Sequence, residues 1–244
     1  MTGRHSPDTP KRPRAASSRT QHGPTVTGRR GELADLTRPR WLSRLGRRLD
    51  QRDPPGTGSA RQAAILVVLV LVDDGEPELL LTQRSDGLGY LPGAAVFPGG
   101  SVERSDRTPV DTALREAHEE TGLDPGSVEI LGHLSERSTP DARFVVTPVV
   151  AWSRQLSFNA PISPDEVTAM GLVGLATLSP LRADNHVALR RIAGDGLGHY
   201  PNSALSGVLP PMTAAVVREL VGVVAAVRRD PGDTPEGRDR PGPE

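Results

Sequence analysis

Cysteine is absent from the 244 residues of this chain. The protein therefore has no disulfide framework, no thiol nucleophile and no thiolate metal site. That absence agrees with a reducing compartment, and we expect the protein to be cytoplasmic. Lysine occurs once, at Lys11, so nearly all positive charge is carried by arginine. We attribute this bias to genome composition rather than to function.

Long apolar runs and a secretory leader are also missing. The most apolar stretch, residues 63–72, has about half the length that a membrane-spanning helix needs. The first thirty residues lack the apolar core of a signal peptide. Because the formal net charge is −1, the chain as a whole is not a polyanion binder. We expect neither nucleic acid as a partner nor a membrane span.

The charge is distributed unevenly along the chain. Residues 1–60 are rich in Pro, Gly, Ser and Thr and contain thirteen basic against five acidic residues, which predicts a disordered basic arm. Within it, residues 41–49 carry apolar side chains at helical spacing. Such a basic helix could bind an anionic membrane or nucleic acid, pack on the domain, or belong to a solvated arm. Residues 61–229 are predicted to form one domain, and residues 230–244 a disordered tail.

Strand and helix patterns alternate through the predicted domain. Apolar and β-branched runs predict strands at residues 63–72, 79–82, 94–97, 128–134, 144–152 and 169–174. Helical spacing predicts helices at residues 109–121 and 211–228, and residues 175–181 are predicted to form a turn or the start of a helix. Pro109 would lie in the first helical turn, where its missing N–H costs nothing. The pattern predicts an α/β fold with a mixed sheet.

A glycine turn, an acidic loop and a short helix make residues 97–123 the most informative stretch. On a helical wheel, Glu116, Glu119 and Glu120 share one face and apolar residues occupy the opposite one. Carboxylates at these spacings repel each other, unless a divalent cation lies between them. Hard cations such as Mg²⁺ prefer oxygen ligands and keep several waters, which leaves room for a phosphate. The preceding glycine pair permits a tight turn that can point a carbonyl at the same cation.

The same stretch resembles the Nudix box, G-x5-E-x7-R-E-U-x-E-E-x-G-U, in which U is apolar. The matching residues are Gly100, Arg115, Glu116, Ala117, Glu119, Glu120, Gly122 and Leu123. Two features differ. Asp106 replaces the first glutamate of the box, and eight rather than seven residues separate it from the arginine. The extra residue lies before the helix, so the helix keeps its register.

This resemblance implies an α/β/α sandwich and a Mg²⁺- or Mn²⁺-dependent hydrolase of a diphosphate linkage. It implies that Glu116, Glu119, Glu120 and the Gly100 carbonyl bind the metal. It also implies that Arg115 holds a glutamate in place, so that Arg115 joins Glu116 and Glu119 as a catalytic residue.

Two roles stay open at this point. The general base is either Glu116 or Glu119 within the box, or Asp141 or Glu166 on a later loop. Asp106 either supports the metal ligands from outside or caps its loop.

Residues 80–100 resemble a second signature, that of coenzyme A pyrophosphatases, L-L-T-x-R-S-x-x-L-R-x-x-x-G-x-V-x-F-P-G-G. This resemblance makes Arg84, Ser85, Phe97 and Gly99 candidates for binding the substrate. Gly89 replaces an arginine of the signature, which would suit the 3′-phosphate of coenzyme A, and Arg84 could fill part of that role.

The combined resemblance implies cleavage of coenzyme A or acyl-CoA to 3′,5′-ADP and (acyl-)4′-phosphopantetheine. The alternatives are a Nudix hydrolase of another nucleoside diphosphate derivative, such as ADP-ribose, NADH or a nucleotide triphosphate, and a nucleotide sensor without activity. A homodimer is also left open.

Overall fold

The computed structural model describes residues 38–53, 60–71, 76–160, 163–178, 186–191 and 205–229. Most of the predicted disordered arm, and the tail from residue 230 onward, lie outside these ranges. The compact unit begins at Pro39 rather than at residue 61. The arm therefore contributes part of its length to the domain.

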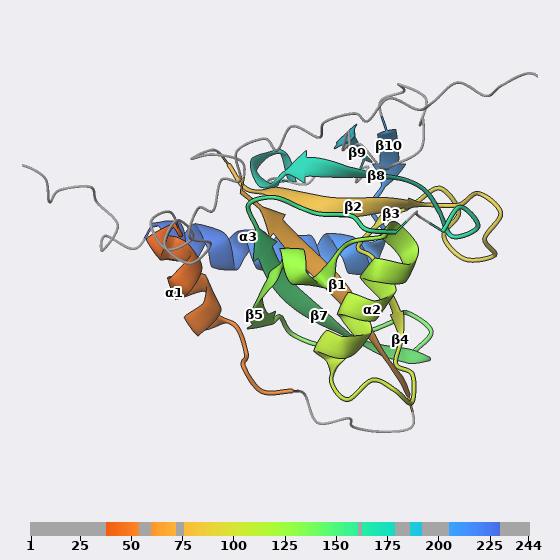
Figure 1. Ribbon diagram of the computed structural model, residues 1–244, viewed down its shortest axis with the longest axis horizontal. Helices are drawn as coiled ribbons and strands as arrows, with labels where there is room; N and C mark the ends of the chain where they lie inside the picture. Colours follow the sequence, from red (N-terminus) through yellow and green to blue (C-terminus); the bar gives the residue numbers. More distant parts are fainter. Residues whose placement is uncertain are drawn as a thin grey trace, which may run out of the picture. The chain divides into compact units, whose positions relative to one another are not determined.

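One mixed sheet forms the centre of the described residues. Its strands are β1 (Arg61–Val70), β2 (Glu78–Arg84), β3 (Ala95–Val96), β4 (Gly99–Ser101), β5 (Glu129–His133), β6 (Arg137–Ser138), β7 (Phe144–Ser153), β8 (Val167–Gly174), β9 (His186–Arg191) and β10 (Leu205–Val208). The order across the sheet is β10-β9-β8-β2-β1-β7-β5 (Figure 1), while β3, β4 and β6 pair with β2, β1 and β7. The β1–β7 pair is parallel and the other pairs are antiparallel.

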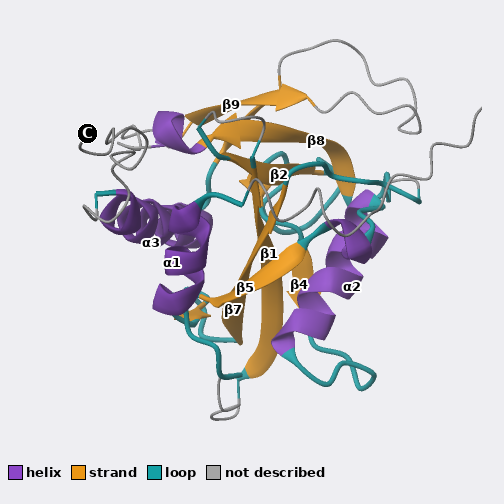
Figure 2. Cartoon of the chain, turned by 60° about the vertical axis from the view of Figure 1, so that its left-hand side comes forward, coloured by secondary structure: helices purple, strands orange, loops and turns teal. Residues whose placement is uncertain are grey.

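Helices cover both faces of this sheet (Figure 2). The helices are α1 (Arg40–Arg48), α2 (Pro109–Thr121) and α3 (Pro211–Arg228), with short 3₁₀ turns at Pro125–Ser127 and Leu175–Leu178. In β1, Ala64 and Leu66 pack with α2, whereas Ile65 and Val67 pack in the core that includes α1 and α3. Because both faces of the strand are buried, it has the near-continuous apolar sequence of a central strand. The predicted α/β/α sandwich is confirmed.

Helix α1 is the part of the predicted arm that joins the domain. Trp41, Leu42 and Leu45 are buried, and the helix contacts α3 and β5. The Arg228 guanidinium lies 5.6 Å from the centroid of the Trp41 ring and donates to Glu76 Oε2 at 2.6 Å. Of the alternatives for this segment, packing on the domain is the one observed.

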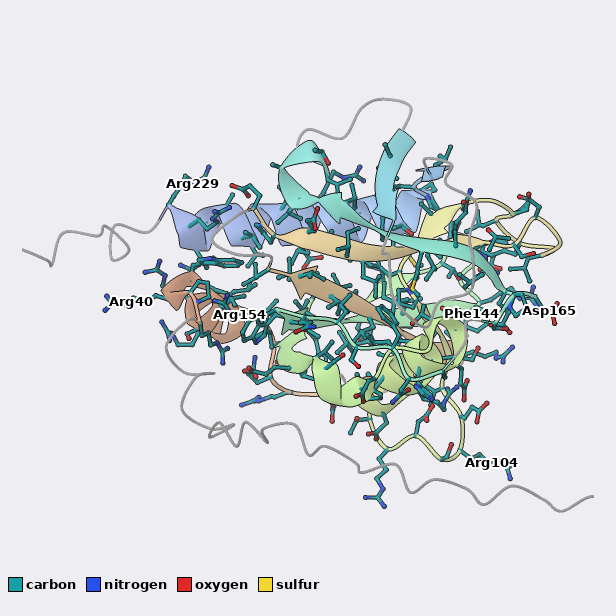
Figure 3. The ribbon with its side chains drawn as sticks, turned by 45° about the horizontal axis from the view of Figure 1, so that its top comes forward. Arg40, Arg104, Phe144, Arg154, Asp165 and Arg229 are labelled. Atoms are coloured by element: carbon teal, nitrogen blue, oxygen red, sulfur yellow. The ribbon has the colours of Figure 1, made fainter. Side chains whose placement is uncertain are left out.

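The polar faces of α1 and α3 are turned to solvent. Arg40 at the start of α1 and Arg229 just after α3 extend away from the ribbon (Figure 3). None of the helices in the described ranges is both long and apolar enough to cross a membrane.

Candidate active site

Helix α2 is fixed at both ends by local interactions. Thr108 Oγ1 accepts a hydrogen bond from Asp111 N at 3.2 Å, and Asp111 Oδ2 accepts one from Thr108 N at 3.0 Å, which makes a reciprocal cap. At the other end Gly122 has a φ of 72°, a left-handed conformation that favours glycine. A Cβ on Gly122 would also clash with the carbonyl oxygen of Ala160. These ends set the register that places the acidic face.

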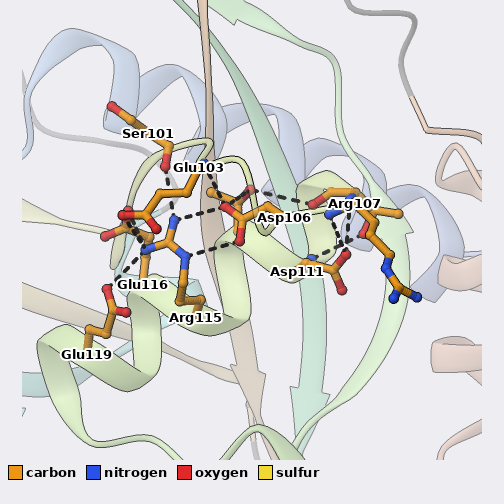
Figure 4. Close-up of polar contacts among 10 residues, drawn as sticks. Ser101, Glu103, Asp106, Arg107, Asp111, Arg115, Glu116 and Glu119 are labelled. Carbon is orange, nitrogen blue, oxygen red and sulfur yellow. Dashed lines mark hydrogen bonds and ion pairs between the residues drawn. The ribbon is translucent and has the colours of Figure 1, made fainter.

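Arg115 connects the helix to the loop before it (Figure 4). Its Nε and Nη2 donate to the two carboxylate oxygens of Asp106 at 3.1 and 2.9 Å, and Nη2 also donates to the Ser101 carbonyl at 3.0 Å. Its Nη1 lies 3.0 Å from Glu119 Oε2 and 3.1 Å from Glu116 Oε1. One guanidinium therefore holds two acids of the box and the acidic loop together.

Asp106 is buried beneath this arginine, with 4% of its side chain exposed. The hydrogen bond from Arg115 holds the pKa of Asp106 at about 2; burial opposes this effect, and bonds from Glu103 N and the Thr112 hydroxyl reinforce it. Asp106 is therefore ionised at neutral pH and bound to the arginine. Both roles left open for it match this arrangement, because Asp106 holds the arginine of the box and also accepts a hydrogen bond from Glu103 N within its own loop.

Two of the box glutamates lie against the glycine turn. Glu120 is 6% exposed and its Oε2 accepts a hydrogen bond from Gly99 N at 3.2 Å. Burial raises the pKa of Glu120 to about 8, against the effect of that N–H, and repulsion from Glu116 and Glu166 adds to the increase. Burial likewise raises the pKa of Glu116, against the attraction of its arginine neighbour. A Cβ at Gly100 would lie 2.5 Å from the Glu116 carboxylate, so only glycine allows this approach.

The third glutamate is more exposed than the other two and shares the Arg115 Nη1 with Glu116. The side chain of Glu119 is 57% exposed and its carboxylate is paired with Arg115. Among the described residues, no three His, Cys, Asp or Glu side chains are already gathered as a metal site. Two acids, Glu116 and Glu120, are thus close to the turn, and the third is held by the arginine.

The donor set nevertheless suits a hard divalent cation. Mg²⁺ is usually bound through one or two carboxylates, with waters and substrate phosphates completing its shell. A buried carboxylate, Glu120, and a partly buried one, Glu116, both with raised pKa values and next to a glycine backbone, are the kind of site that a cation would stabilise. Glu119 lies against the same arginine nitrogen as Glu116.

The two outside candidates for general base differ in their surroundings. The charge of Glu166 acts on both Glu116 and Glu120, and its loop is attached to the end of β2 by a bond from Ser85 N to the Glu166 carbonyl at 2.8 Å. Asp141 instead accepts a hydrogen bond from Thr139 Oγ1 at 2.6 Å within its own loop. That bond lowers the pKa of Asp141. Glu166 is therefore the acid near the box.

A pocket of about 150 Å³ opens beside the glycine turn. Three of the four predicted substrate-binding residues, Arg84, Phe97 and Gly99, line it. Ser85 does not; its hydroxyl accepts a hydrogen bond from Gly87 N at 3.3 Å and closes the turn after β2. The lining residues that sequence reasoning missed are Ile65, Tyr90, Leu91, Val96, Thr139, Pro140, Pro210, Pro211, Met212 and Thr213. Of these, only Tyr90, Leu91 and Val96 could have been found from the sequence, because they lie inside the stretch that resembles the second signature.

Comparison with known proteins decides the family. The NUDIX domain model matches residues 60–192. The chain belongs to the NUDIX domain family. A Nudix relative from Klebsiella pneumoniae strain 342, named "Uncharacterized Nudix hydrolase NudL", is 38% identical over 170 residues, which cover 68% of this chain and 84% of the relative. A NudL protein from Yersinia enterocolitica is 33% identical over 172 residues, or 70% and 86% of the two chains.

Among solved structures, the Nudix hydrolase RenU from M. Smegmatis is similar to this chain, with 19% sequence identity and a TM-score of 0.47. The matched region covers 73% of this chain and 94% of the RenU chain. As a Nudix hydrolase, the protein is a pyrophosphohydrolase of nucleoside diphosphate derivatives. Nudix hydrolases generally use divalent ions such as Mg²⁺ or Mn²⁺. The superfamily part of the sequence interpretation is thus confirmed.

Proposed function

We propose that this Nudix protein hydrolyses the diphosphate of coenzyme A or acyl-CoA to 3′,5′-ADP and (acyl-)4′-phosphopantetheine. One observation carries the choice of substrate. The stretch that resembles the coenzyme A pyrophosphatase signature forms much of the pocket beside the box, through Arg84, Tyr90, Phe97 and Gly99. The pocket and the acids meet at Gly99, which lines the pocket and donates its N–H to Glu120.

In this proposal Glu116 and Glu120 would hold Mg²⁺ or Mn²⁺, with Glu119 and the Gly100 carbonyl as further ligands. When bound, the cation supplies neutralisation of the phosphate oxygens and a more acidic water. Arg115 positions the acids, because it contacts both Glu116 and Glu119. Two hydrogen bonds to Asp106 hold Arg115 in place, so Glu119 is not needed to anchor it and would be available as a ligand.

Glu166 is the general base in this scheme. The attacking water adds to one phosphorus, its proton passes to the Glu166 carboxylate, and the bond from that phosphorus to the bridging oxygen breaks. Each product then keeps one phosphate of the original diphosphate. Phosphoryl transfer needs mainly positioning and charge stabilisation from the protein; here the acids would supply charge stabilisation through the cation that they hold, and Arg115 positions those acids. Arg84 lies close enough to Glu120 for its charge to act on that carboxylate, and it would bind the 3′-phosphate or the diphosphate.

A substrate panel tests the proposal. Coenzyme A, acetyl-CoA, ADP-ribose, NADH and nucleotide triphosphates are incubated with Mg²⁺ or Mn²⁺, and the products are identified by mass. We expect cleavage of coenzyme A to 3′,5′-ADP, and its loss in Glu120→Gln. Hydrolysis of ADP-ribose with coenzyme A untouched would reject the substrate but keep the family chemistry. Ligand binding without turnover of any compound would favour a sensor.

The general base has its own test. Glu166→Gln should lower kcat by about a hundredfold or more with little change in KM, as expected for loss of a base. Asp141→Asn, which alters the other loop acid, should keep kcat within about threefold of the natural value. Equal activity of the two variants would remove Glu166 from this role.

A further inference from the structure

The pocket beside the box is lined by residues from separate parts of the chain. Tyr90 and Leu91 come from the loop after β2, and Thr139 and Pro140 from the loop after β6. Residues 210–213, at the start of α3, also line it. They lie beyond residue 192, where the match to the NUDIX domain ends. The start of α3 thus lines the pocket from outside the segment that the family model matches.

The wall formed by the β2 loop is rigid. The Arg84 side chain donates from Nε to the Tyr90 carbonyl at 3.1 Å, and Gly93 N donates to the Arg84 carbonyl at 3.2 Å. Leu91 has a φ of 52°, a left-handed conformation that a leucine adopts only when its surroundings impose it. Strained backbone of this kind is concentrated at ligand sites. The backbone of the loop is therefore tied to the end of β2 on both sides of Leu91.

The lining of the pocket is narrow and mostly apolar. Two adjacent prolines, Pro210 and Pro211, line the pocket together with Met212 and Tyr90, and Tyr90 is 61% exposed. The hydroxyl of Thr139 already donates to Asp141 and accepts from Phe144 N. Pantetheine is a flexible chain without a ring, so it has no flat face to stack on Tyr90. A flat heteroaromatic ring has apolar faces and matches such a slot.

We infer that this pocket holds the adenine ring of the substrate, and that Tyr90 and Met212 are the side chains that determine its binding. The inference rests on the proposed function, because it places the nucleotide half of coenzyme A next to Arg84 and the box. The pantetheine half then lies outside the pocket. Base–aromatic stacking is expected to change binding by about tenfold or more when the ring is removed.

The test compares two truncations with two conservative changes and one control. Tyr90→Ala and Met212→Ala remove the proposed contacts, whereas Tyr90→Phe and Met212→Leu keep ring and volume. Val208→Ala is the control, because Val208 is 43% exposed and does not line the pocket. Thermal unfolding first establishes that all five variants are folded. Steady-state kinetics with coenzyme A and calorimetric titration with 3′,5′-ADP and with 4′-phosphopantetheine follow.

We expect both truncations to raise KM for coenzyme A by about tenfold or more while kcat stays within about threefold. They should weaken 3′,5′-ADP binding in parallel and leave 4′-phosphopantetheine binding unchanged. The conservative variants and the control should behave like the natural protein. Weakened binding of 4′-phosphopantetheine instead, or unchanged binding of both halves, would overturn the inference.

Failure of the proposed function gives a different result. If the natural protein cleaves ADP-ribose or NADH and not coenzyme A, the coenzyme A proposal fails on its own. The same variants are then assayed on that adenine-containing substrate, with AMP as the titrated half. A rise in KM of about tenfold and weaker AMP binding would keep the pocket assignment, and unchanged values would reject it.

Discussion

Replacing Asp106 by asparagine tests whether the Arg115 cluster stabilises the acidic loop on the helix. Asp106 receives two hydrogen bonds from Arg115, one from Thr112 Oγ1 and one from Glu103 N. The amide that replaces the carboxylate would keep one acceptor oxygen but turn an NH₂ group toward these donors. The negative charge opposite the guanidinium would also be lost. The change therefore removes the charged acceptor of Arg115 and places an NH₂ donor against other hydrogen-bond donors at a buried position.

The size of the effect follows from the kind of bond that is broken. Hydrogen bonds to charged groups contribute about 1.5–3 kcal/mol, and removing one partner of a buried ion pair costs about 3–5 kcal/mol. Arg115 keeps Glu116 and Glu119 as neighbours, which reduces the loss. We expect Asp106→Asn to lower the free energy of unfolding by about 3 kcal/mol.

Urea denaturation at pH 7 measures this loss, with Asp111→Asn as the matched control. Asp111 is part of the cap of the same helix, and an asparagine at this position keeps an accepting oxygen. Asp111→Asn should therefore lower the free energy of unfolding by less than about 1 kcal/mol. A double-mutant cycle with Arg115→Met should then show a coupling energy of about 2 kcal/mol. If the two changes are additive within about 0.5 kcal/mol, the arginine does not stabilise the loop through Asp106 and our reasoning is wrong.

Three further changes probe other positions of the fold. Gly122→Ala should destabilise by at least about 2 kcal/mol, because it imposes a left-handed φ on alanine and a backbone clash; a smaller change in the urea midpoint would contradict this. His133 is buried, its ring nitrogens have no hydrogen-bond partner among the described residues, and its contact with the half-exposed Asp53 is long, 3.9 Å from Nε2 to Oδ1, so His133→Leu should stabilise by about 1 kcal/mol in the same assay. Burial would raise the pKa of Glu219, but hydrogen bonds from Ser135 and Arg137 outweigh it and lower that pKa. Glu219 therefore stabilises the fold at pH values above its unfolded-state pKa, and this stabilisation is lost as pH falls through its folded-state pKa. Glu219→Gln should make the free energy of unfolding less dependent on pH in the acid range. An unchanged slope would argue against this role of Glu219.

Residues adjacent in sequence predict α2 well, whereas features that depend on contacts between distant residues are predicted poorly. The predicted bounds, residues 109–121, coincide with the helix because Thr108, Pro109 and Gly122, which set its ends, adjoin it in sequence. The sequence predicts a domain that starts at residue 61, because no residue near Trp41 in the sequence reveals its contact with Arg228. A partner at the opposite end of the domain sequence cannot be found from local periodicity.

For the sheet, too, local patterns are predicted from the sequence and pairing between distant segments is not. Strands β9 and β10 were not predicted, because each is stabilised by its neighbours in the sheet rather than by a strong apolar pattern of its own. The turn at Gly99 and Gly100 was predicted, but its pairing with β1 as strand β4 was not. Within the candidate site, helical spacing placed three glutamates on one face and could not show that Arg115 binds Glu119. Side-chain direction depends on which partner is nearest, and that is a tertiary property.

Helix α3 has a consequence for any shortened version of this protein. Its side chains Ala214, Val217 and Leu220 are fully buried and belong to the core on one face of the sheet. A chain ending at residue 192, where the recognisable family segment stops, would leave that face open to water. Burying a large aliphatic side chain contributes about 1.5–3 kcal/mol, so losing several removes an amount comparable to the whole stability of a typical domain, about 5–15 kcal/mol. We therefore expect a chain that lacks the portion beyond the family match to lose most of the stability of its catalytic half.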